Sequence, residues 1–369
     1  MSTLSYLEKL LDGIEVEWKA LGTEIKTVTA PSKLKSGAYC DTGRFPIIDQ
    51  GIKFIAAYTD EDVTPVVTGE YIIFGDHSEH IKYVDFSFVQ GADGLKILRS
   101  ISASAKYIYY SFQNFYKKEL SYKRHWSSAK ETLIPIPCPE NPEKSLEIQE
   151  EIVRILDTFT ELTTELTTEL TARKKQYNYY RDQLLSFEEG QVEWKALGEV
   201  CESISSGKNK DKSEAGEFPV YGSTGIIGRT DNKIYEVEQI LVARVGANAG
   251  RVNIADGKYD VSDNTLILKI KENISLKYLY YYLVNLNLNR FTKGAGQPLL
   301  TGGQLKAMII PVPPPEEQKR IVTILDKFDA LANSITEGLP REIALRQQQY
   351  EYYRDLLLSF PKPDAEVAA

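Results

Sequence analysis

The sequence repeats one plan, and this internal duplication constrains the fold more than any single motif. Four segments occur twice in the same order: VEWKALG (16–22 and 192–198), a proline-rich segment (134–139 and 310–315), IVRILDTF or IVTILDKF (152–159 and 321–328), and YNYYRDQLLSF or YEYYRDLLLSF (177–187 and 350–360). Identity between the copies is high in these border segments and low in the stretches between them. A duplicated sequence usually folds as duplicated units, so we expect two domains that share a scaffold and differ in surface.

The chain has 369 residues, which is more than one typical hydrophobic core needs. From the repeat we predict a first globular domain at 1–142 and a second at 190–315. Helical segments at 143–189 and 316–361 follow the two domains, and a tail at 362–369 ends the chain.

The repeated segments have the apolar spacing of amphipathic helices. Apolar residues alternate steps of three and four in both copies, at Ile152, Ile155, Phe159, Leu162 and Leu166 and again at Ile321, Ile324, Phe328, Leu331 and Ile335. Asn141 before Pro142 is typical of a helix start, and Gly338-Leu339-Pro340 predicts a kink or break in the second helix. Because one exposed apolar stripe is not stable alone, we expect the helices to pack as an antiparallel coiled coil between the globular units.

The globular stretches combine short β-rich runs with a tyrosine-rich helix. In the first we expect strands at 45–48, 66–67, 71–74 and 85–89, a helix at 106–120 and a short helix at 4–11. In the second, the segment 216–228 corresponds to 43–51 and the segment 239–246 corresponds to 70–77. A helix expected at 276–291 corresponds to the first tyrosine-rich helix. The expected fold class is α+β, with two globular domains related by a pseudo-two-fold repeat and separated by the two long helices.

The tetrapeptide TELT occurs three times in succession in the first helical segment, at 160–163, 164–167 and 168–171. Four residues advance a helix by about 6 Å and about 400°. One copy more or less would therefore change the length of the helix while turning its far end by only about 40°. We interpret the repeat as a length adjuster, and the alternative is a chance low-complexity patch on a solvated helix.

Composition excludes some classes of protein. The net charge of −8 at first argues against a nucleic-acid partner, but segment 143–189 alone holds 11 acidic and 6 basic side chains, so the globular parts are near neutral. No apolar run approaches the length of a membrane helix and no signal-peptide pattern opens the chain, so we expect a cytoplasmic protein. Cys40, Cys138 and Cys201 are far apart, which indicates reduced structural thiols rather than disulfides or a CxxC metal site.

Motifs of enzymes are absent from the sequence. It has no GxxxxGK[ST] loop, no HExxH, no GxSxG, no GxGxxG after a strand, and no Asn-Pro-Pro-Tyr or Asp-Pro-Pro-Tyr of the kind that amino-methyltransferases use. His77 and His80 lie three residues apart beside two carboxylates, but a polar surface turn explains them better than a metal site does. We expect no catalytic residue and no metal in this chain.

Side chains that suit DNA contacts gather in the loops between the expected strands. Lys, Arg, Asn and Gln make the phosphate contacts and bidentate base contacts of DNA-binding proteins. The candidates of the first domain are Gln50, His77, Lys82, Gln90, Lys123, Arg124 and His125. Those of the second are Lys208, Lys210, Ser223, Thr224, Arg229, Arg244, Asn248, Arg251, Lys293 and Gln297. For any single residue the alternative is a solvated surface position, and taken together they are a candidate DNA-facing surface.

The combination of these features resembles a known family. The duplicated plan, the pair IPIPCPE…QEEIVRILDTF and IPVPPPEEQKRIVTILDKF, the YYRDxLLSF helix ends, the PVYGSTGIIG loop and the GAGQPLL segment are similar to the DNA-specificity subunit of type I restriction–modification systems. The resemblance covers nearly the whole chain. The TELT triplet further resembles the tetrapeptide repeats in the central spacer of the type IC subfamily.

The resemblance implies a recognition subunit without chemistry of its own. Each globular unit would be a target-recognition domain that reads one half of a bipartite double-stranded DNA target, and the helices would set the gap between the halves. The helices would also dock two modification subunits, which methylate adenine, and restriction subunits would complete the complex. S-adenosylmethionine, ATP and Mg are expected in those partners and not in this chain. The loop at 222–225 matches the family pattern, whereas Asp49-Gln50-Gly51 stands at the matching place in the first domain.

A protein of another class would fit the same sequence. A scaffold could use a paired coiled coil to join other proteins without touching nucleic acid. A DNA reader should lose duplex affinity steeply as salt rises, whereas a scaffold should show no such dependence. An enzyme that acts alone is the third alternative.

Overall fold

The computed structural model describes residues 13–361 except positions 92, 211–212, 295 and 335. The chain divides into two compact units, of which unit 1 comprises 1–165 with 344–369 and unit 2 comprises 166–343. The helix expected at 4–11, Ile335 and the tail at 362–369 lie outside the described residues. Within the described part, no helix is long and apolar enough to cross a membrane.

Unit 1 contains three small sheets. A two-stranded sheet pairs β1 (Val16–Ala20) with β9 (Leu133–Pro137). The four-stranded sheet has the order β2 (Ile25–Val28), β8 (Leu95–Ser100), β5 (Tyr71–Gly75), β6 (Ile81–Val84), and the three-stranded sheet has the order β4 (Ala57–Thr59), β3 (Phe45–Ile48), β7 (Val89–Gln90). The shorter helices are α2 (Leu21–Glu24), η1 (Ser36–Ala38), α3 (Ala105–Phe115) and α4 (Trp126–Ala129).

Unit 2 repeats this arrangement strand for strand. Its two-stranded sheet pairs β10 (Glu193–Ala196) with β18 (Ile309–Val312). The four-stranded sheet has the order β11 (Cys201–Ser206), β17 (Thr265–Ile270), β14 (Gln239–Ala243), β15 (Val252–Ala255), and the three-stranded sheet has the order β13 (Gly225–Thr230), β12 (Phe218–Gly222), β16 (Asp260–Val261). The shorter helices are α6 (Leu197–Val200), α7 (Leu276–Asn285), η2 (Leu288–Phe291) and α8 (Gly302–Lys306). Every sheet of unit 2 therefore has the strand order of its counterpart, which confirms the predicted pseudo-repeat.

The two border motifs of the sequence pair with each other in space. In unit 1 the heptapeptide strand lies antiparallel to the proline-rich strand, with Trp18 opposite Pro135, and in unit 2 Trp194 lies opposite Pro311 in the same way. Proline has no amide to donate, and each of these strands has only one neighbour in its sheet, so the missing donor interrupts no further ladder. Each repeated strand pair thus joins the first strand of its globular part to the last one.

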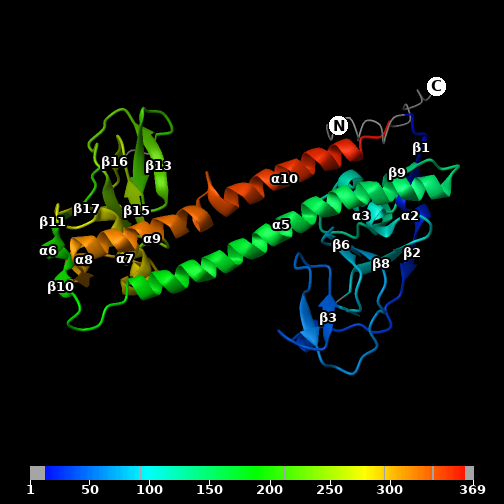
Figure 1. The fold of residues 1–369 in the computed structure, drawn as a ribbon, viewed down its shortest axis with the longest axis horizontal. Coiled ribbons are helices and arrows are strands. Elements are labelled where there is room, and N and C mark those ends of the chain that lie inside the picture. The colour runs from blue at the N-terminus through cyan, green and yellow to red at the C-terminus, as the bar shows by residue number, and fades with distance from the viewer. Residues whose placement is uncertain (1–12, 92, 211–212, 295, 335, 362–369) are drawn as a thin grey trace. The chain divides into compact units, whose positions relative to one another are not determined.

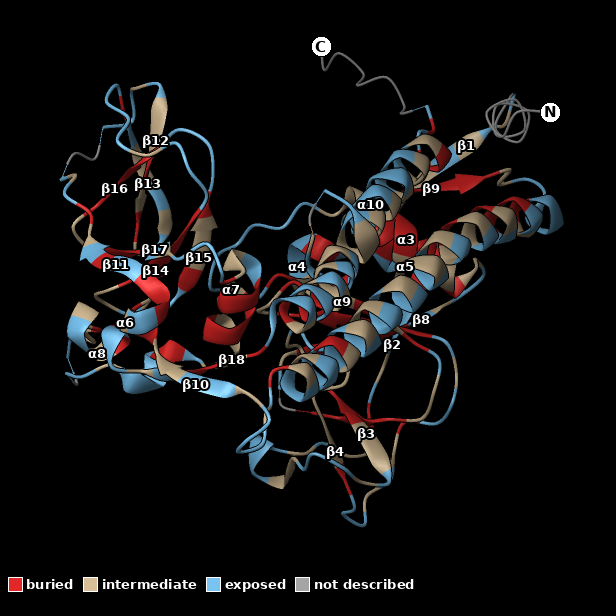
Figure 2. Cartoon of the chain, turned by 60° about the vertical axis from the view of Figure 1, so that its left-hand side comes forward, coloured by how far each residue is buried: buried red, intermediate tan, exposed pale blue. Residues whose placement is uncertain are grey.

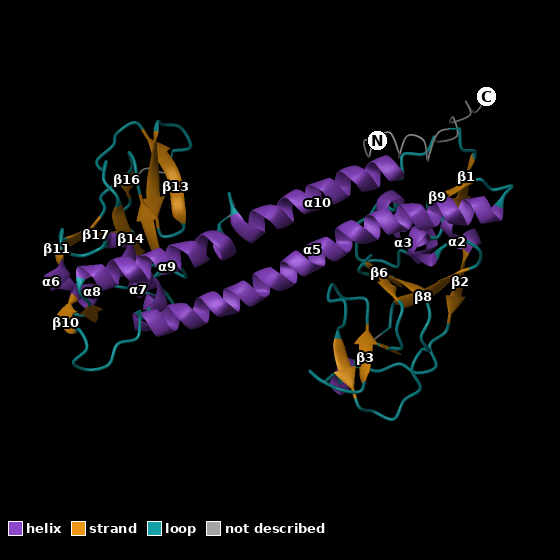
Figure 3. Ribbon diagram, viewed as in Figure 1, coloured by secondary structure: helices purple, strands orange, loops and turns teal. Residues whose placement is uncertain are grey.

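Three helices follow the globular parts: α5 (Pro142–Leu184), α9 (Pro315–Asn333) and α10 (Gly338–Leu357). Asn141 caps α5 as predicted, because its Oδ1 accepts a 3.1 Å hydrogen bond from the amide of Lys144. The predicted break in the second helical segment is confirmed, since a loop separates α9 from α10 (Figure 3). Gly338 has φ +73°, and a Cβ there would lie 2.3 Å from the carbonyl oxygen of Ala330, so only glycine fits.

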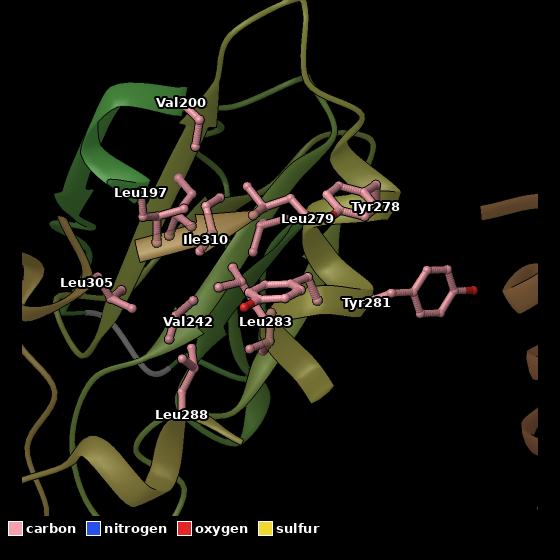
Figure 4. Packing of buried hydrophobic residues seen from close by; sticks show 14 of the residues in the cluster. Leu197, Val200, Val242, Tyr278, Leu279, Tyr281, Leu283, Leu288, Leu305 and Ile310 are labelled. Atoms are coloured by element: carbon pink, nitrogen blue, oxygen red, sulfur yellow. The ribbon is translucent and has the colours of Figure 1, made fainter. Parts of the chain in front are cut away.

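The tyrosine-rich helices are hydrogen-bonded to the proline-rich strands of their own units. Tyr107 of α3 is fully buried and donates a 2.7 Å hydrogen bond to the carbonyl oxygen of Pro135, and Tyr278 of α7 donates a 3.0 Å bond to that of Pro311. Figure 2 shows much of α3 and of α7 coloured as buried. In the core of unit 2, Tyr278 and Leu279 lie among aliphatic side chains while Tyr281 points away from them (Figure 4).

Aromatic contacts join the long helices α5, α9 and α10 within each unit. In unit 1 the ring of Phe159 in α5 stacks on Tyr353 of α10 at 5.1 Å between centroids, and the two helices run side by side there (Figure 1). In unit 2 Tyr180 of α5 stacks on Phe328 of α9 at 5.5 Å. These contacts lie within single units, so a coiled coil along the whole length of the helices stays a prediction.

Some predicted element boundaries are wrong. The first tyrosine-rich helix ends at Phe115 rather than at 120, and the second ends at Asn285 rather than at 291, because Asn287 adopts a left-handed conformation before the separate turn η2. No strand forms at 66–67, where Val66 makes only an isolated bridge to Phe88, and the run at 85–89 contributes only Val89 to β7. Residue type alone favoured strands there, but strand formation also depends on pairing with neighbouring chain, which is limited here to the isolated bridge and to β7.

Candidate nucleic-acid interface

In unit 1, loops that are distant in sequence meet at the hairpin turn 76–80 between β5 and β6. Gln50 reaches this turn from the loop after β3: its Oε1 accepts a 3.3 Å hydrogen bond from the amide of His77, and its Nε2 donates to the carbonyl oxygen of Asp93 at 3.2 Å. The amide of Asp76 donates to the carbonyl oxygen of Gly94 at 2.6 Å. The turn is therefore bound to the loops that follow β3 and β7.

The loop 116–125, between α3 and α4, packs on the other side of the same turn. His77 Nδ1 lies 3.1 Å from the carbonyl oxygen of Lys123, so this nitrogen carries the proton. The ring of His77 stacks on Tyr122 with centroids 5.8 Å apart. The predicted contacts Gln50, His77, Lys123 and Arg124 thus gather on neighbouring loops, with Arg124 exposed to solvent.

Buried acids hold the loop 116–125 in place. Glu79 Oε1 accepts hydrogen bonds from the hydroxyl of Tyr116 at 2.6 Å and from the amide of Glu119 at 2.8 Å, and Oε2 accepts from the amide of Leu120 at 2.9 Å. Burial opposes ionisation of Glu79, but the three hydrogen bonds outweigh burial and hold the pKa of its carboxyl below the usual value. Asp76 Oδ1 accepts from the amide of Trp126 at 2.8 Å and anchors the end of the loop.

Three predicted contacts of unit 1 lie inside the fold. Lys82 is buried and donates from Nζ to the carbonyl oxygens of Asp49 and Lys53 at 2.8 and 2.6 Å, and burial lowers the pKa of its ammonium. His125 is fully buried with Nε2 2.8 Å from the carbonyl oxygen of Ser121. Gln90 is buried in β7. These side chains shape the loops from within, and a direct DNA contact by any of them stays a prediction.

Unit 2 builds an equivalent loop surface with different residues. The turn 244–251 joins β14 to β15, as the turn 76–80 joins β5 to β6. The segment 286–301 packs on it: the amide of Gly246 donates to the carbonyl oxygen of Pro298 at 3.0 Å, and Asn289 Nδ2 donates to that of Ala249 at 2.9 Å. The predicted contacts that this brings together are Arg244, Asn248, Arg251, Lys293 and Gln297.

The other predicted contacts of unit 2 lie in the loop after β11 and in the β12–β13 hairpin. The amide of Lys208 donates to the carbonyl oxygen of Val261 at 3.0 Å, and the side chains of Lys208 and Lys210 are exposed. Ser223 and Thr224 form the tip of the β12–β13 hairpin. Arg229 folds back, since its guanidinium donates to the carbonyl oxygens of Gly216 and Glu217 at 2.7 and 2.5 Å, and thereby supports the loop before β12.

The residues that organise these surfaces are not among the predicted DNA contacts. In the sequence Asp76 and Glu79 are only the carboxylates beside His77 and His80, yet they anchor the loop 116–125. Asn289, which binds the turn 244–251, has no signal in the sequence. Across the residues that the structure describes, no group of three or more His, Cys, Asp or Glu side chains could hold a metal ion.

Comparison with known sequences agrees with this duplicated arrangement. A family profile described as the type I restriction modification DNA specificity domain matches residues 17–174 and 190–345. The chain belongs to the family of type I restriction–modification DNA specificity subunits. Relatives of this specificity subunit match over more than nine tenths of its length. The EcoR124I/EcoR124II specificity subunit of Escherichia coli is 44% identical over 99% of both chains, and the EcoprrI specificity subunit of Escherichia coli is 35% identical over 91% of this chain and 93% of the relative.

Solved structures share the fold of the specificity subunit. The S subunit of a type I restriction–modification system from M. genitalium has a TM-score of 0.67 at 18% identity and covers 95% of this chain and 98% of its own. A chain from a study of complex assembly and conformational transition of the type I R-M system has a TM-score of 0.57 at 17% identity, with coverage of 94% and 98%. At such low identities the likeness concerns the fold alone.

Proposed function

We propose that this specificity subunit reads a bipartite, gapped DNA target, with unit 1 on one half-site and unit 2 on the other. One observation carries the proposal. The two units have the same three sheets with the same strand orders, but their side chains differ where the loops converge. At that place unit 1 presents His77, Tyr122 and Arg124, whereas unit 2 presents Asn248, Arg251 and Lys293. Base edges are distinguished by the side chains that meet them, so two different loop surfaces on one scaffold suit two different half-sites.

The chain itself contributes recognition and no chemistry. Its converging loops carry backbone-anchored polar side chains, and the buried acids among them are engaged by amide and hydroxyl donors rather than left free to transfer protons. We assign adenine methylation with S-adenosylmethionine to modification subunits, and ATP- and Mg-dependent cleavage to restriction subunits. The complex would act in the cytoplasm, where its DNA target lies.

Exposed residues that are identical in the two repeats support the docking of a partner at two sites. Tyr179 and Tyr352 occupy equivalent positions and are 62% and 54% exposed. The neighbouring Asp182 and Asp355 are likewise equivalent and exposed. Identity at buried positions follows from packing, but packing does not explain identical exposed aromatic side chains. A surface that occurs twice in one chain suits one kind of partner bound twice, and we assign it to two modification subunits.

Sequencing of DNA methylation tests the recognition function. A host would express the modification subunit with or without the full chain. We expect one gapped adenine-methylation motif that depends on the chain, and exchange of residues 190–315 for those of a relative should change one half of the motif. Unchanged methylation in the presence of an active modification subunit would refute the proposal in favour of a scaffold.

Native mass measurement of the purified complex tests docking separately. The double variant Tyr179→Ser, Tyr352→Ser should reduce the number of bound modification subunits, whereas Val237→Ser removes an equally exposed apolar side chain outside the repeated segments and should not. Equal loss in both variants would show that the repeated tyrosines have no special part in assembly.

A further inference from the structure

The tip of the loop 116–125 exposes two large apolar side chains. Leu120 is 86% exposed and Tyr122 is 96% exposed, and Tyr122 touches the chain through its stack on His77. Exposed apolar area of this size is unfavourable in water. A single exposed apolar residue is ordinary, but these two lie two positions apart on one anchored loop.

The backbone of Leu120 makes this side chain still less favourable for the isolated protein. Its φ is +55°, in the left-handed region that glycine and asparagine adopt easily and leucine does not. Leu120 packs in none of the hydrophobic clusters of the described residues. Backbone conformation and solvation therefore both favour another residue here, and the benefit of leucine must come from outside the chain.

The loop holds this tip in one conformation. Glu79 accepts hydrogen bonds from the amides of Glu119 and Leu120 and from the hydroxyl of Tyr116. Its buried carboxylate therefore holds the left-handed residue Leu120 in place. Glu79 itself has φ +55°. Two left-handed residues joined by a partly buried hydrogen bond form a preorganised element, and a preorganised tip loses little conformational entropy when it binds.

The charges around the tip identify its partner. Lys117, Lys118 and Arg124 are exposed on the same loop, and Lys123 pairs with Glu119, the loop's one acidic residue. Basic side chains that flank an apolar tip suit phosphates on either side of a groove, and apolar wedges that enter a groove and contact base steps are a known mode of DNA binding. A protein partner would not require this surplus of positive charge.

We propose that Leu120 and Tyr122 are specificity-determining residues that make apolar contacts to the bases of the half-site read by unit 1. The inference rests on the proposed function and names residues of unit 1 that contact the DNA. Glu79 acts as the positioning residue, because it holds the tip without reaching DNA. None of the three residues Leu120, Tyr122 and Glu79 is among the polar residues that were predicted from the sequence to contact DNA.

The left-handed conformation of Leu120 permits a sharp test. Leu120→Gly and Leu120→Asn remove the apolar side chain while suiting the backbone, so the thermal stability of the full chain should stay unchanged or rise. Assembled with the modification subunit, both variants should bind the cognate duplex about tenfold more weakly, the scale of one lost base contact. Discrimination should fall in one half-site only, and the salt dependence should not change because no charge is lost.

Val67→Ala is the matched control, since it removes an exposed aliphatic side chain of unit 1 outside the converging loops. Unchanged affinity and half-site discrimination in a folded Leu120→Gly complex would overturn the inference. Weaker assembly with the modification subunit at unchanged DNA affinity would also overturn it and would assign the tip to a protein contact. If the unaltered complex showed no sequence-specific binding, the proposed function itself would fail, which separates the two outcomes.

Discussion

Tyr110 donates a 2.7 Å hydrogen bond to Oδ1 of Asp157 and so joins the tyrosine-rich helix α3 to the long helix α5. Lys106 donates to the other carboxylate oxygen at 2.6 Å. Unit 2 has the same contact, in which Asp326 of α9 accepts from Tyr281 and Lys277, each at 2.7 Å. One carboxylate in each unit therefore fixes the globular part to the helix, and burial together with this acid raises the pKa of both tyrosines.

Replacing Asp157 should destabilise unit 1. Asp157→Ala leaves the buried hydroxyl of Tyr110 and the half-buried ammonium of Lys106 without this acceptor, which should cost about 2 kcal/mol and lower the Tm by roughly 5 °C. Thermal unfolding of the full chain measures the change. Asp355→Ala is the control, because Asp355 is 64% exposed and pairs with its neighbour Arg354, so its loss should cost no more than about 0.5 kcal/mol. Equal effects would show that the Tyr110 contact is not structural.

A glycine pair in unit 2 distinguishes backbone strain from steric overlap. Gly250 has φ +92° and a Cβ there would lie 2.4 Å from the amide nitrogen of Asn289, whereas Gly246 has φ +79° and nothing within 4 Å. Gly250→Ala should therefore cost about 3 kcal/mol, from strain and overlap together, and Gly246→Ala only about 1 kcal/mol. Binding to duplexes with one scrambled half-site should show that Gly250→Ala impairs the unit 2 half alone. Equal losses in the two variants would contradict the close packing of the turn 244–251 on Asn289.

The carboxyl of Glu79 predicts a pH dependence. Its folded pKa lies below the ordinary value of 4.5, so its hydrogen bonds contribute stability that is fully present above that value and is lost as the pH falls through the lower folded pKa. Glu79→Gln should be less stable than the unaltered chain by about 1–2 kcal/mol at neutral pH. This difference should vanish in acid. A difference that stayed constant with pH would mean that the charge of Glu79 plays no part in holding the loop.

The sequence predicts the architecture better than it predicts the recognition surfaces. The repeats predicted two units of one architecture, and local rules located the cap at Asn141, strand β3 and the break before Gly338, because each of these three depends on neighbouring residues. The pairing of β1 with β9 joins residues more than a hundred positions apart, such as Trp18 and Pro135, and no local rule reaches that far.

The loops show most clearly what cannot be predicted from the sequence alone. The tyrosine-rich helix ends at Phe115 because the following residues turn to meet Glu79, a contact across 37 positions that helical spacing cannot reveal. Lys82 and Arg124 are equally good candidates by residue type, but only the fold shows that Lys82 is enclosed by carbonyl oxygens while Arg124 is exposed. Residue type predicts what a side chain can bind, and tertiary structure decides whether it is free to do so.

Lys82 and Arg124 should consequently differ in how their loss affects DNA binding. Arg124→Ala removes an exposed charge and should reduce the salt dependence of binding by about one phosphate contact. Lys82→Met keeps side-chain volume but leaves two carbonyl oxygens unsatisfied, so it should cost about 2 kcal/mol of stability and leave the salt dependence unchanged. Titrations of the assembled complex at several salt concentrations measure both. A reduced salt dependence in Lys82→Met would indicate that this lysine turns outward to a phosphate.

The TELT triplet predicts a change of gap without a change of half-sites. The three copies lie inside the continuous helix α5, and Thr160, Thr163 and Thr171 bond their hydroxyls to carbonyl oxygens four residues earlier. Deletion of 164–167 would shorten the helix by about 6 Å with a residual turn of about 40°. Since about 3.4 Å separates successive base pairs, the preferred gap should shorten by one or two base pairs. Methylation sequencing of the deletion variant reads the gap and both half-sites together. Altered half-sites at an unchanged gap would contradict the role of the helix as a spacer. A shorter gap with the same half-sites would show that α5 sets the gap while the loops of the two units recognise the half-sites.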